Sequence, residues 1–237
     1  MHDIALLQHF YATPLGKQVS DDINALLHDI HCPSTQDMVA ALGYGIPYLD
    51  AIAGNSTHKL ALMPASLGAA LRQSHPQCLV QPHLLPLADA SLHSLLLVHA
   101  LEHEVDVKLV LRETWRVIQD DGHLLLVLPY RSGLWSSHAE QPFGQGTPYS
   151  FHQIRKLLHD TGFTINTQQR CLYYPPIQSA FGLHIARLLQ PIMRLVLPIL
   201  AGVIVIHAHK TLLQPTPVGK RQPIFTAKVI ANHRQSS

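Results

Sequence analysis

Short runs of apolar residues recur through the first 130 residues of the chain, and most of them do not alternate with polar residues. Their lengths suit β-strands, and the lack of alternation is typical of strands that are buried on both faces. Such strands form parallel sheets covered by helices on both sides, so the pattern predicts an α/β fold. The runs are residues 38–42, 59–63, 78–80, 93–99 and 123–128.

The segment between the last two runs predicts a helix. Residues 106–118, DVKLVLRETWRVI, have their apolar positions on one helical face, and the Asp-Asp-Gly sequence at 120–122 then turns the chain. A strand, a helix and a strand in this order predict a βαβ unit with a right-handed crossover. Residues 151–163 predict a further helix that ends in glycine, and residues 164–173 and 202–212 predict two more strands.

The periodicity divides the chain into three parts. Residues 1–36 predict an N-terminal helical cap, residues 37–213 hold the main domain, and residues 214–237 form a polar tail. Within the main domain, residues 177–199 are helical and strongly apolar, which predicts an insertion before the last strand that packs on the rest of the domain. Arg194 and two prolines interrupt this apolar stretch, so it is not expected to span a membrane, but contact with a membrane surface stays open.

Composition and charge narrow the class of partner. The net charge is +2 and the basic residues are scattered, so nucleic acid is not expected as a partner. The three cysteines are odd in number and far apart, which indicates neither a disulfide framework nor a zinc ribbon. The N-terminus shows no secretory signal. We therefore expect a cytoplasmic protein.

The end of the first predicted strand is the first place to look for a ligand, because parallel sheets bind ligands beyond the carboxyl ends of their strands. This strand ends in Gly43-Tyr44-Gly45, where glycines allow a close approach of a cofactor, and Pro47 stands where a third glycine is usual. Proline is also common in the first turn of a helix. A cofactor loop and a structural turn therefore explain this sequence equally well.

Residues 85–129 carry a resemblance to a known family. The matching residues are Leu85-Pro86, Asp89, Leu101-Glu102-His103, Arg116-Val117-Ile118 and Asp121-Gly122. With these motifs around two consecutive strands, residues 37–213 resemble the class I S-adenosylmethionine (SAM)-dependent methyltransferases that act on small molecules. The resemblance implies a Rossmann-like fold with a seven-stranded, mostly parallel sheet, SAM as the cofactor and methyl transfer as the activity.

The cofactor edge departs from the family pattern. Family members usually carry acidic residues at three positions that here hold Ala41, Met63 and Gln81, and the acid at the second position accepts the ribose hydroxyls. A hydrogen bond to a charged group contributes about 1.5–3 kcal/mol, so its loss weakens cofactor binding by about one to two orders of magnitude. The residues that the resemblance places along the donor are Gly43, Tyr44, Gly45, Met63, Gln81 and His99.

Two functional hypotheses follow. In the first, the chain is a methyltransferase for an unidentified small or lipid-like acceptor, and His99 or Glu102 accepts a proton. Gly43→Asp is then expected to abolish donor binding without unfolding the protein, and Met63→Asp to tighten it. In the second, the chain is a catalytically inactive binding or scaffold protein with a protein partner, and side chains such as Met63 and Tyr44 fill the cleft.

The sequence HALEH, residues 99–103, also matches the H-x-x-E-H motif of zinc proteases. That motif needs both histidines on one face of a helix, whereas here the segment continues an apolar strand, so we expect no metal site. His99 then acts as a base or caps the end of the strand.

Four aromatic residues follow the fifth predicted strand in a segment too long for a tight connection. They are Tyr130, Trp135, Phe143 and Tyr149. We expect them to line a substrate site; the alternative is that they pack on the domain.

Overall fold

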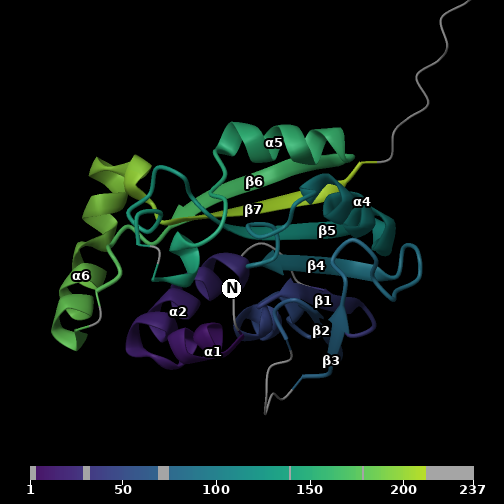
Figure 1. Ribbon diagram of the computed structural model, residues 1–237, viewed down its shortest axis with the longest axis horizontal. Helices are drawn as coiled ribbons and strands as arrows, with labels where there is room; N and C mark the ends of the chain where they lie inside the picture. Colours follow the sequence, from purple (N-terminus) through teal and green to yellow (C-terminus); the bar gives the residue numbers. More distant parts are fainter. Residues whose placement is uncertain (1–3, 29–32, 69–74, 139, 178, 212–237) are drawn as a thin grey trace, which may run out of the picture.

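A computed structural model of the chain describes residues 4–28, 33–68, 75–138, 140–177 and 179–211 (Figure 1). Seven strands form one sheet in the order β3-β2-β1-β4-β5-β7-β6. The strands are β1 (Met38–Gly43), β2 (His58–Pro64), β3 (Gln77–Val80), β4 (Leu92–Val98), β5 (Ile118–Pro129), β6 (Phe163–Cys171) and β7 (Val203–Lys210). Strands β1 to β5 run parallel to one another, and β7 is antiparallel to both β5 and β6. The expected seven-stranded, mostly parallel α/β fold is confirmed.

Helices cover both faces of this sheet. They are α1 (Ile4–Ala12), α2 (Pro14–His28), α3 (Leu49–Ala53), α4 (Val107–Val117), α5 (Phe151–Asp160) and α6 (Ala180–Val196), with short 3₁₀ turns η1 (Ile46–Tyr48), η2 (Pro142–Gly144) and η3 (Pro198–Leu200). Helices α1, α2 and α3 share one buried apolar cluster with the sheet, and α4 and α5 share the cluster on its other face. α6 lies at the outside of the molecule, beyond the ends of β6 and β7 (Figure 1).

Local signals explain where two helices begin. The side chain of Asp106 accepts hydrogen bonds from the backbone N–H groups of Lys108 and Leu109, which caps α4. Ser150 and Gln153 form a reciprocal capping box at the start of α5. Because each of these caps satisfies backbone donors that the helix itself leaves unpaired, the predicted helices form close to their expected bounds.

The expected turn at residues 120–122 is wrong, because these residues belong to β5. The pairing of β4 with β5 shifts from Leu92 opposite Ile118 to Ser94 opposite His123, so the extra residues form a bulge within the strand. Lys210 of β7 holds this bulge: its ammonium group donates to the carbonyl of Ile118 at 2.9 Å and lies 3.3 Å from a carboxylate oxygen of Asp120.

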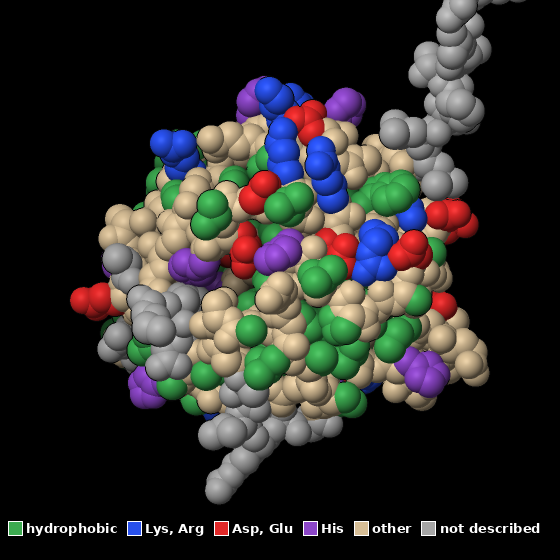
Figure 2. All heavy atoms as spheres, turned by 45° about the vertical axis from the view of Figure 1, so that its right-hand side comes forward, with side chains coloured by type: hydrophobic (Ala, Val, Ile, Leu, Met, Phe, Trp, Pro, Cys, Tyr) green, Lys and Arg blue, Asp and Glu red, His purple; other side chains and the backbone are tan. Residues whose placement is uncertain are grey.

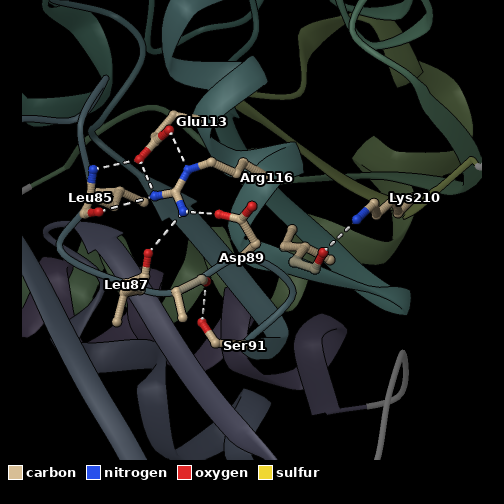
Figure 3. Close-up of polar contacts among 9 residues, drawn as sticks. Leu85, Leu87, Asp89, Ser91, Glu113, Arg116 and Lys210 are labelled. Carbon is tan, nitrogen blue, oxygen red and sulfur yellow. Dashed lines mark hydrogen bonds and ion pairs between the residues drawn. The ribbon is translucent and has the colours of Figure 1, made fainter.

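An arginine joins the segment before β4 to helix α4 (Figure 3). We call this set of residues the Arg116 network; it consists of Leu85, Leu87, Asp89, Glu113 and Arg116. The guanidinium of Arg116 donates to the carbonyls of Leu85 and Leu87 at 3.1 and 2.9 Å, and to the carboxylates of Asp89 and Glu113 at 2.5–2.9 Å. Glu113 also accepts from the backbone N–H of Leu85 at 2.7 Å. Three of the motif residues, Leu85, Asp89 and Arg116, therefore join the segment before β4 to α4.

The polar tail predicted at 214–237 lies outside the described residues, as does Cys32.

Candidate active site

A cavity of about 530 Å³ lies beyond the carboxyl ends of β2 and β4. These strands flank β1 in the sheet, so the cavity is at the point where the strand order reverses. Its volume falls in the range of small-molecule and cofactor sites. Its walls are formed by Pro64, Ser66, Leu67, His99, Ala100, His103, Glu104, Gln145 and Gly146.

His99 stands directly after β4, and its backbone has a positive φ of 53°. A left-handed conformation is uncommon for a residue other than glycine, and here it sends the imidazole toward helix α1. Tyr48 donates its hydroxyl proton to the Tyr11 oxygen at 2.8 Å, and the Tyr11 hydroxyl lies 3.0 Å from Nε2 of His99. The Tyr11 hydroxyl therefore links Tyr48 to His99 in a chain of two hydrogen bonds.

The break between α1 and α2 brings Tyr11 to this place. A Cβ atom on Gly16 would lie 2.0 Å from the carbonyl oxygen of Phe10, so only glycine allows the two helices to approach so closely. Tyr11 is then buried among the rings of Tyr44, Tyr48 and His99. Burial raises the pKa of Tyr48 well above its ordinary value, and it raises the pKa of Tyr44 to about 12.

Glu102 is the second expected proton acceptor, and it is 4% exposed. One of its carboxylate oxygens accepts from the backbone N–H of Leu101 at 3.0 Å, whereas the other, Oε1, has no hydrogen-bond partner among the described residues. Burial raises the pKa of Glu102 from 4.5 to about 7. We call Tyr11, Tyr48, His99 and Glu102 the His99 cluster.

The segment that contains η2 closes over the end of β4. Gly146 has a φ of +75°, and a Cβ atom there would lie 2.7 Å from Cβ of Glu102. Thr147 donates its backbone N–H to the carbonyl of Glu102 at 2.9 Å, and the Tyr149 hydroxyl donates to the carbonyl of Leu101 at 3.2 Å. These contacts exclude water from the His99 cluster on this side.

The four aromatic residues expected to line a substrate site are placed differently. Phe143 packs on His99 with ring centroids 4.5 Å apart, and Trp135 is buried with its Nε1 donating to the carbonyl of Tyr174 at 2.7 Å. Tyr130 lies under the guanidinium of Arg170, and Tyr149 is buried beside Glu102. None of the four is among the residues that line the cavity. In this structure they pack on the domain, and a role toward an acceptor stays a prediction.

The Gly43-Tyr44-Gly45 turn packs against β4. Gly43 has a φ of +91°, and a Cβ atom there would lie 2.0 Å from the carbonyl oxygen of Val98. The backbone N–H of Tyr44 donates to the same carbonyl at 2.9 Å, and Pro47 lies within η1. The expectation that Gly43→Asp leaves the fold intact is therefore wrong, since any side chain at Gly43 collides with β4.

Met63 and Gln81, which stand where acids are usual, do not line the cavity either. Met63 is 0% exposed and belongs to the apolar core, so Met63→Asp would bury a carboxylate there. The substitution is therefore expected to lower stability, and tighter cofactor binding stays a prediction. Gln81 is exposed and pairs with Leu84 through a short backbone bridge.

The cavity suits SAM in place and volume. Beside His99 and His103, which the sequence singled out, its polar groups come from residues that it did not. Ser66, Glu104 and Gln145 line it. Ser66 and Glu104 follow the ends of β2 and β4 by a few residues, which is the one signal that the sequence offered for them. Gln145 reaches the cavity from a distant segment, and no local pattern marks it.

The H-x-x-E-H motif does not form a helix. Residues 99–106 make turns between β4 and α4, so His99 and His103 are not one helical turn apart. A search of the described residues finds no group of histidine, cysteine and acidic side chains that could hold a metal ion.

Comparisons with known proteins agree with this architecture. Residues 40–126 match the family model of the methyltransferase domain. No curated protein sequence matches the chain.

Several solved structures share the fold. A SAM-dependent methyltransferase of Thermotoga maritima, described as a possible histamine N-methyltransferase, is 14% identical, with a TM-score of 0.62 over 86% of this chain and 94% of that one. Geranyl diphosphate C-methyltransferase of Streptomyces coelicolor, in complex with S-adenosylhomocysteine, is 13% identical, with a TM-score of 0.57 over 80% and 75%.

A Haloferax volcanii methyltransferase in complex with the Trm112 activator is 15% identical, with a TM-score of 0.56 over 79% and 88%. At these identities the likeness establishes the fold, and together with the domain match it confirms the resemblance to class I SAM-dependent methyltransferases.

Proposed function

We propose that this chain, which has the class I methyltransferase fold, binds SAM in the cavity beyond β2 and β4 and transfers its methyl group to a small or lipid-like acceptor. The observation that supports this most is the cavity itself, which lies at the switch point of the sheet and has His99 on its wall. Ligand sites in open α/β sheets are found at this position whatever the chemistry, so the cavity is the natural place for a cofactor.

Glu104 is our candidate for the group that replaces the missing ribose acid. It is the one carboxylate among the described residues that line the cavity, and Ser66 offers a hydroxyl on the same wall. Burial raises the pKa of Glu104, and the charge of His83 counteracts this. A carboxylate in this position can accept hydrogen bonds from sugar hydroxyls as an acid at the end of β2 would.

A second cavity provides a place for the acceptor. It has a volume of about 350 Å³ and lies between α1, the start of α2 and the segment 140–145. Gln145 lines both cavities, so they are neighbours. The second cavity is lined by Leu6, Leu7, His9, Phe10, Thr13, Pro14, Leu15, Glu140, Gln141, Pro142 and Gln145, a largely apolar set. Such a lining favours an acceptor with a hydrophobic part.

Methyl transfer requires alignment, exclusion of water and a destination for a proton. SAM supplies a methyl group on a positively charged sulfur when it is bound. His99 lines the cavity, and the hydrogen bond between its Nε2 and the Tyr11 hydroxyl orients the imidazole, so this ring is our first candidate for the proton acceptor. Glu102, whose charge acts on Tyr11, has a pKa near 7, so its carboxyl group can exchange a proton at neutral pH. Positioning of the two reactants supplies most of the remaining rate enhancement.

The second hypothesis, an inactive binding or scaffold protein, keeps one specific observation in its favour. Met63 is part of the apolar core and Tyr44 lies beneath Tyr11, so side chains occupy much of the edge where a donor would meet acids. The Trm112 complex of a structural neighbour shows that a chain of this fold can have a protein partner. Donor binding separates the two hypotheses.

The test is a binding measurement on two matched variants. Ser66→Trp places an indole in the donor cavity, and Ser137→Trp makes the same change at an exposed position outside it. We expect S-adenosylhomocysteine to raise the melting temperature of the wild type and of Ser137→Trp, and to have no effect on Ser66→Trp. Equal shifts in all three proteins would show that the ligand binds elsewhere and contradict the assignment.

We also propose that the protein is cytoplasmic. Cys78 and Cys171 are both free thiols, which agrees with the reducing cytoplasm expected from the sequence.

A further inference from the structure

Helix α6 turns its apolar side away from the protein. Phe181, Leu188 and Leu195 are 78%, 71% and 84% exposed, although apolar side chains of this size are normally buried. The exposed residues recur at spacings of three and four, so they form one continuous stripe along the helix. The stripe consists of Phe181, Ile185, Leu188, Leu189, Ile192, Leu195 and Val196. The prediction that this segment packs on the domain holds for little more than Leu183 and Ala186.

Polar contacts fix this orientation. Asp22 of α2 faces the opposite side of α6: burial raises its pKa, while the hydrogen bonds of Tyr174 and Gln190 and the charge of Arg187 lower it. The hydroxyl of Tyr174 donates to Asp22 at 2.8 Å. Because the polar side of α6 is held against α2, the apolar stripe has to point outward. The contacts around Asp22 therefore determine that the apolar stripe of α6 faces outward.

The dimensions of α6 suit a surface more than a span. Its 17 residues extend over about 25 Å at 1.5 Å per residue. Among the described residues, no helix has the length and hydropathy needed to cross a bilayer. Leu197 and Ile199 continue the exposed apolar surface beyond the helix. Figure 1 shows that α6 stands at the edge of the molecule, where a flat partner can reach its whole length.

Charge selects the kind of partner. All 15 acidic residues of the chain precede residue 161, whereas eight of the 17 Lys and Arg residues follow it, among them Arg187 and Arg194 on α6. The face in Figure 2, which brings the right-hand side of Figure 1 forward, instead carries Lys, Arg, Asp and Glu side by side. Helix α6 therefore combines an apolar stripe with two exposed arginines on its remaining surface and no acidic residue, a composition that suits an anionic lipid surface.

We propose that α6 is an interfacial helix that docks the protein on an anionic lipid surface, with its apolar stripe turned toward the acyl region. This docking does not depend on the activity proposed above. It would also bring a lipid-like acceptor close to the cavities.

The test is co-sedimentation of the full chain with vesicles. We expect binding to vesicles of equal parts phosphatidylglycerol and phosphatidylcholine to exceed binding to phosphatidylcholine alone by about tenfold, and to weaken at high salt. The double variant Leu188→Glu/Leu195→Glu should lose at least about tenfold in binding. As a matched control, Leu84→Glu/Val105→Glu places the same charges at exposed apolar positions away from α6 and should bind as the wild type does.

Three results would overturn the proposal. The first is equal binding to both vesicle types, and the second is equal loss of binding in the two double variants. The third is a stable dimer in lipid-free solution that Leu188→Glu/Leu195→Glu converts to a monomer, because the stripe would then be covered by a second copy. Melting temperatures check that all variants fold; they should match the wild type, because every substituted side chain is exposed.

Discussion

The Arg116 network and the His99 cluster are both dense groups of polar side chains, but they are built in opposite ways. Every nitrogen of the Arg116 guanidinium has a partner, and Asp89 and the network's outer edge face solvent. In the His99 cluster the groups are buried, one oxygen of Glu102 has no partner among the described residues, and His99 has a positive φ. The first arrangement stabilises the fold, whereas the second lowers stability at the place where chemistry is proposed.

This difference also separates fold from function. The Arg116 network contains several of the residues that carry the family resemblance, and its contacts tie the chain before β4 to α4 without touching the donor cavity. The cavity wall is built from other residues. A chain can therefore keep this part of the pattern for structural reasons alone, and the activity has to be tested at the cavity.

The largest expected effect on stability comes from substitution of Arg116, the central residue of the Arg116 network. Arg116→Ala removes the partner of Glu113, whose side chain is only 11% exposed, and should lower the free energy of unfolding by about 2–3 kcal/mol. Arg112→Ala, on the exposed side of the same helix, is the control and should change it by less than about 0.5 kcal/mol. Urea denaturation measures both. A similar small loss in the two variants would mean that the network does not hold the fold.

Glu102→Gln, in the His99 cluster, should raise the free energy of unfolding, whereas Arg116→Ala should lower it. The folded pKa of Glu102, about 7, lies above its ordinary value of 4.5, so its contribution to stability is present below pH 4.5 and is lost as the pH rises through 7. We expect Glu102→Gln to raise the free energy of unfolding at pH 8 by on the order of 1–3 kcal/mol, and by much less at pH 5. Denaturation at the two pH values checks this. A variant less stable than the wild type at pH 8 would show that the carboxylate has partners in solution.

Tyr11→Phe tests how much the hydrogen bonds within the His99 cluster contribute to stability. It removes the hydroxyl that accepts from Tyr48 and is hydrogen-bonded to His99. The buried Tyr48 hydroxyl and the His99 ring each lose this hydrogen bond. The free energy of unfolding should fall by about 1–2 kcal/mol. Tyr130→Phe removes a hydroxyl from a half-buried ring outside the cluster and should have almost no effect. Equal effects of the two substitutions would mean that the hydroxyl chain contributes nothing to stability.

The smallest expected effect concerns a pair of histidines on the adjacent strands β5 and β7. His123 and His207 lie 3.0 Å apart on neighbouring strands. Burial lowers the pKa of both, with further lowering from neighbouring histidines, and that of His207 falls to about 4. Their contribution to stability is present above pH 6.5 and is lost as the pH falls toward 4.

Between pH 7 and pH 5.5 we therefore expect the wild type to lose on the order of 1 kcal/mol of stability through these histidines. His207→Asn should reduce this acid loss, and the control His159→Asn, at an exposed position, should leave it unchanged. Thermal denaturation in a pH series measures it. An identical acid loss in both variants would assign the pH dependence to other groups.

Most of the fold could be predicted because it depends on local patterns. The apolar runs gave the strands, and residues such as Asp106 and Ser150 marked helix starts. The turn expected at 120–122 failed because Lys210, about 90 residues away, holds that segment in β5. The outward orientation of the α6 stripe was not predicted for a similar reason, because the contacts around Asp22 determine which side of the helix faces the protein.

The site was predicted only in part. The sequence placed His99 at the end of β4, and the structure puts it on the wall of the cavity. Met63 and Gln81 were expected there from their positions after strands, but one is buried in the core and the other is exposed elsewhere. Glu104 and Gln145 were missed, because which loop residues face a cavity depends on how distant segments approach each other.

The most direct test of the central claim is a calorimetric titration of the ligand-free protein with SAM and with S-adenosylhomocysteine, repeated on Glu104→Gln. We predict micromolar binding to the wild type and a loss of about tenfold or more in Glu104→Gln, because the ribose hydroxyls would lose a charged acceptor. No binding of either compound at millimolar concentration would contradict the account and leave a binding or scaffold protein on an inherited fold.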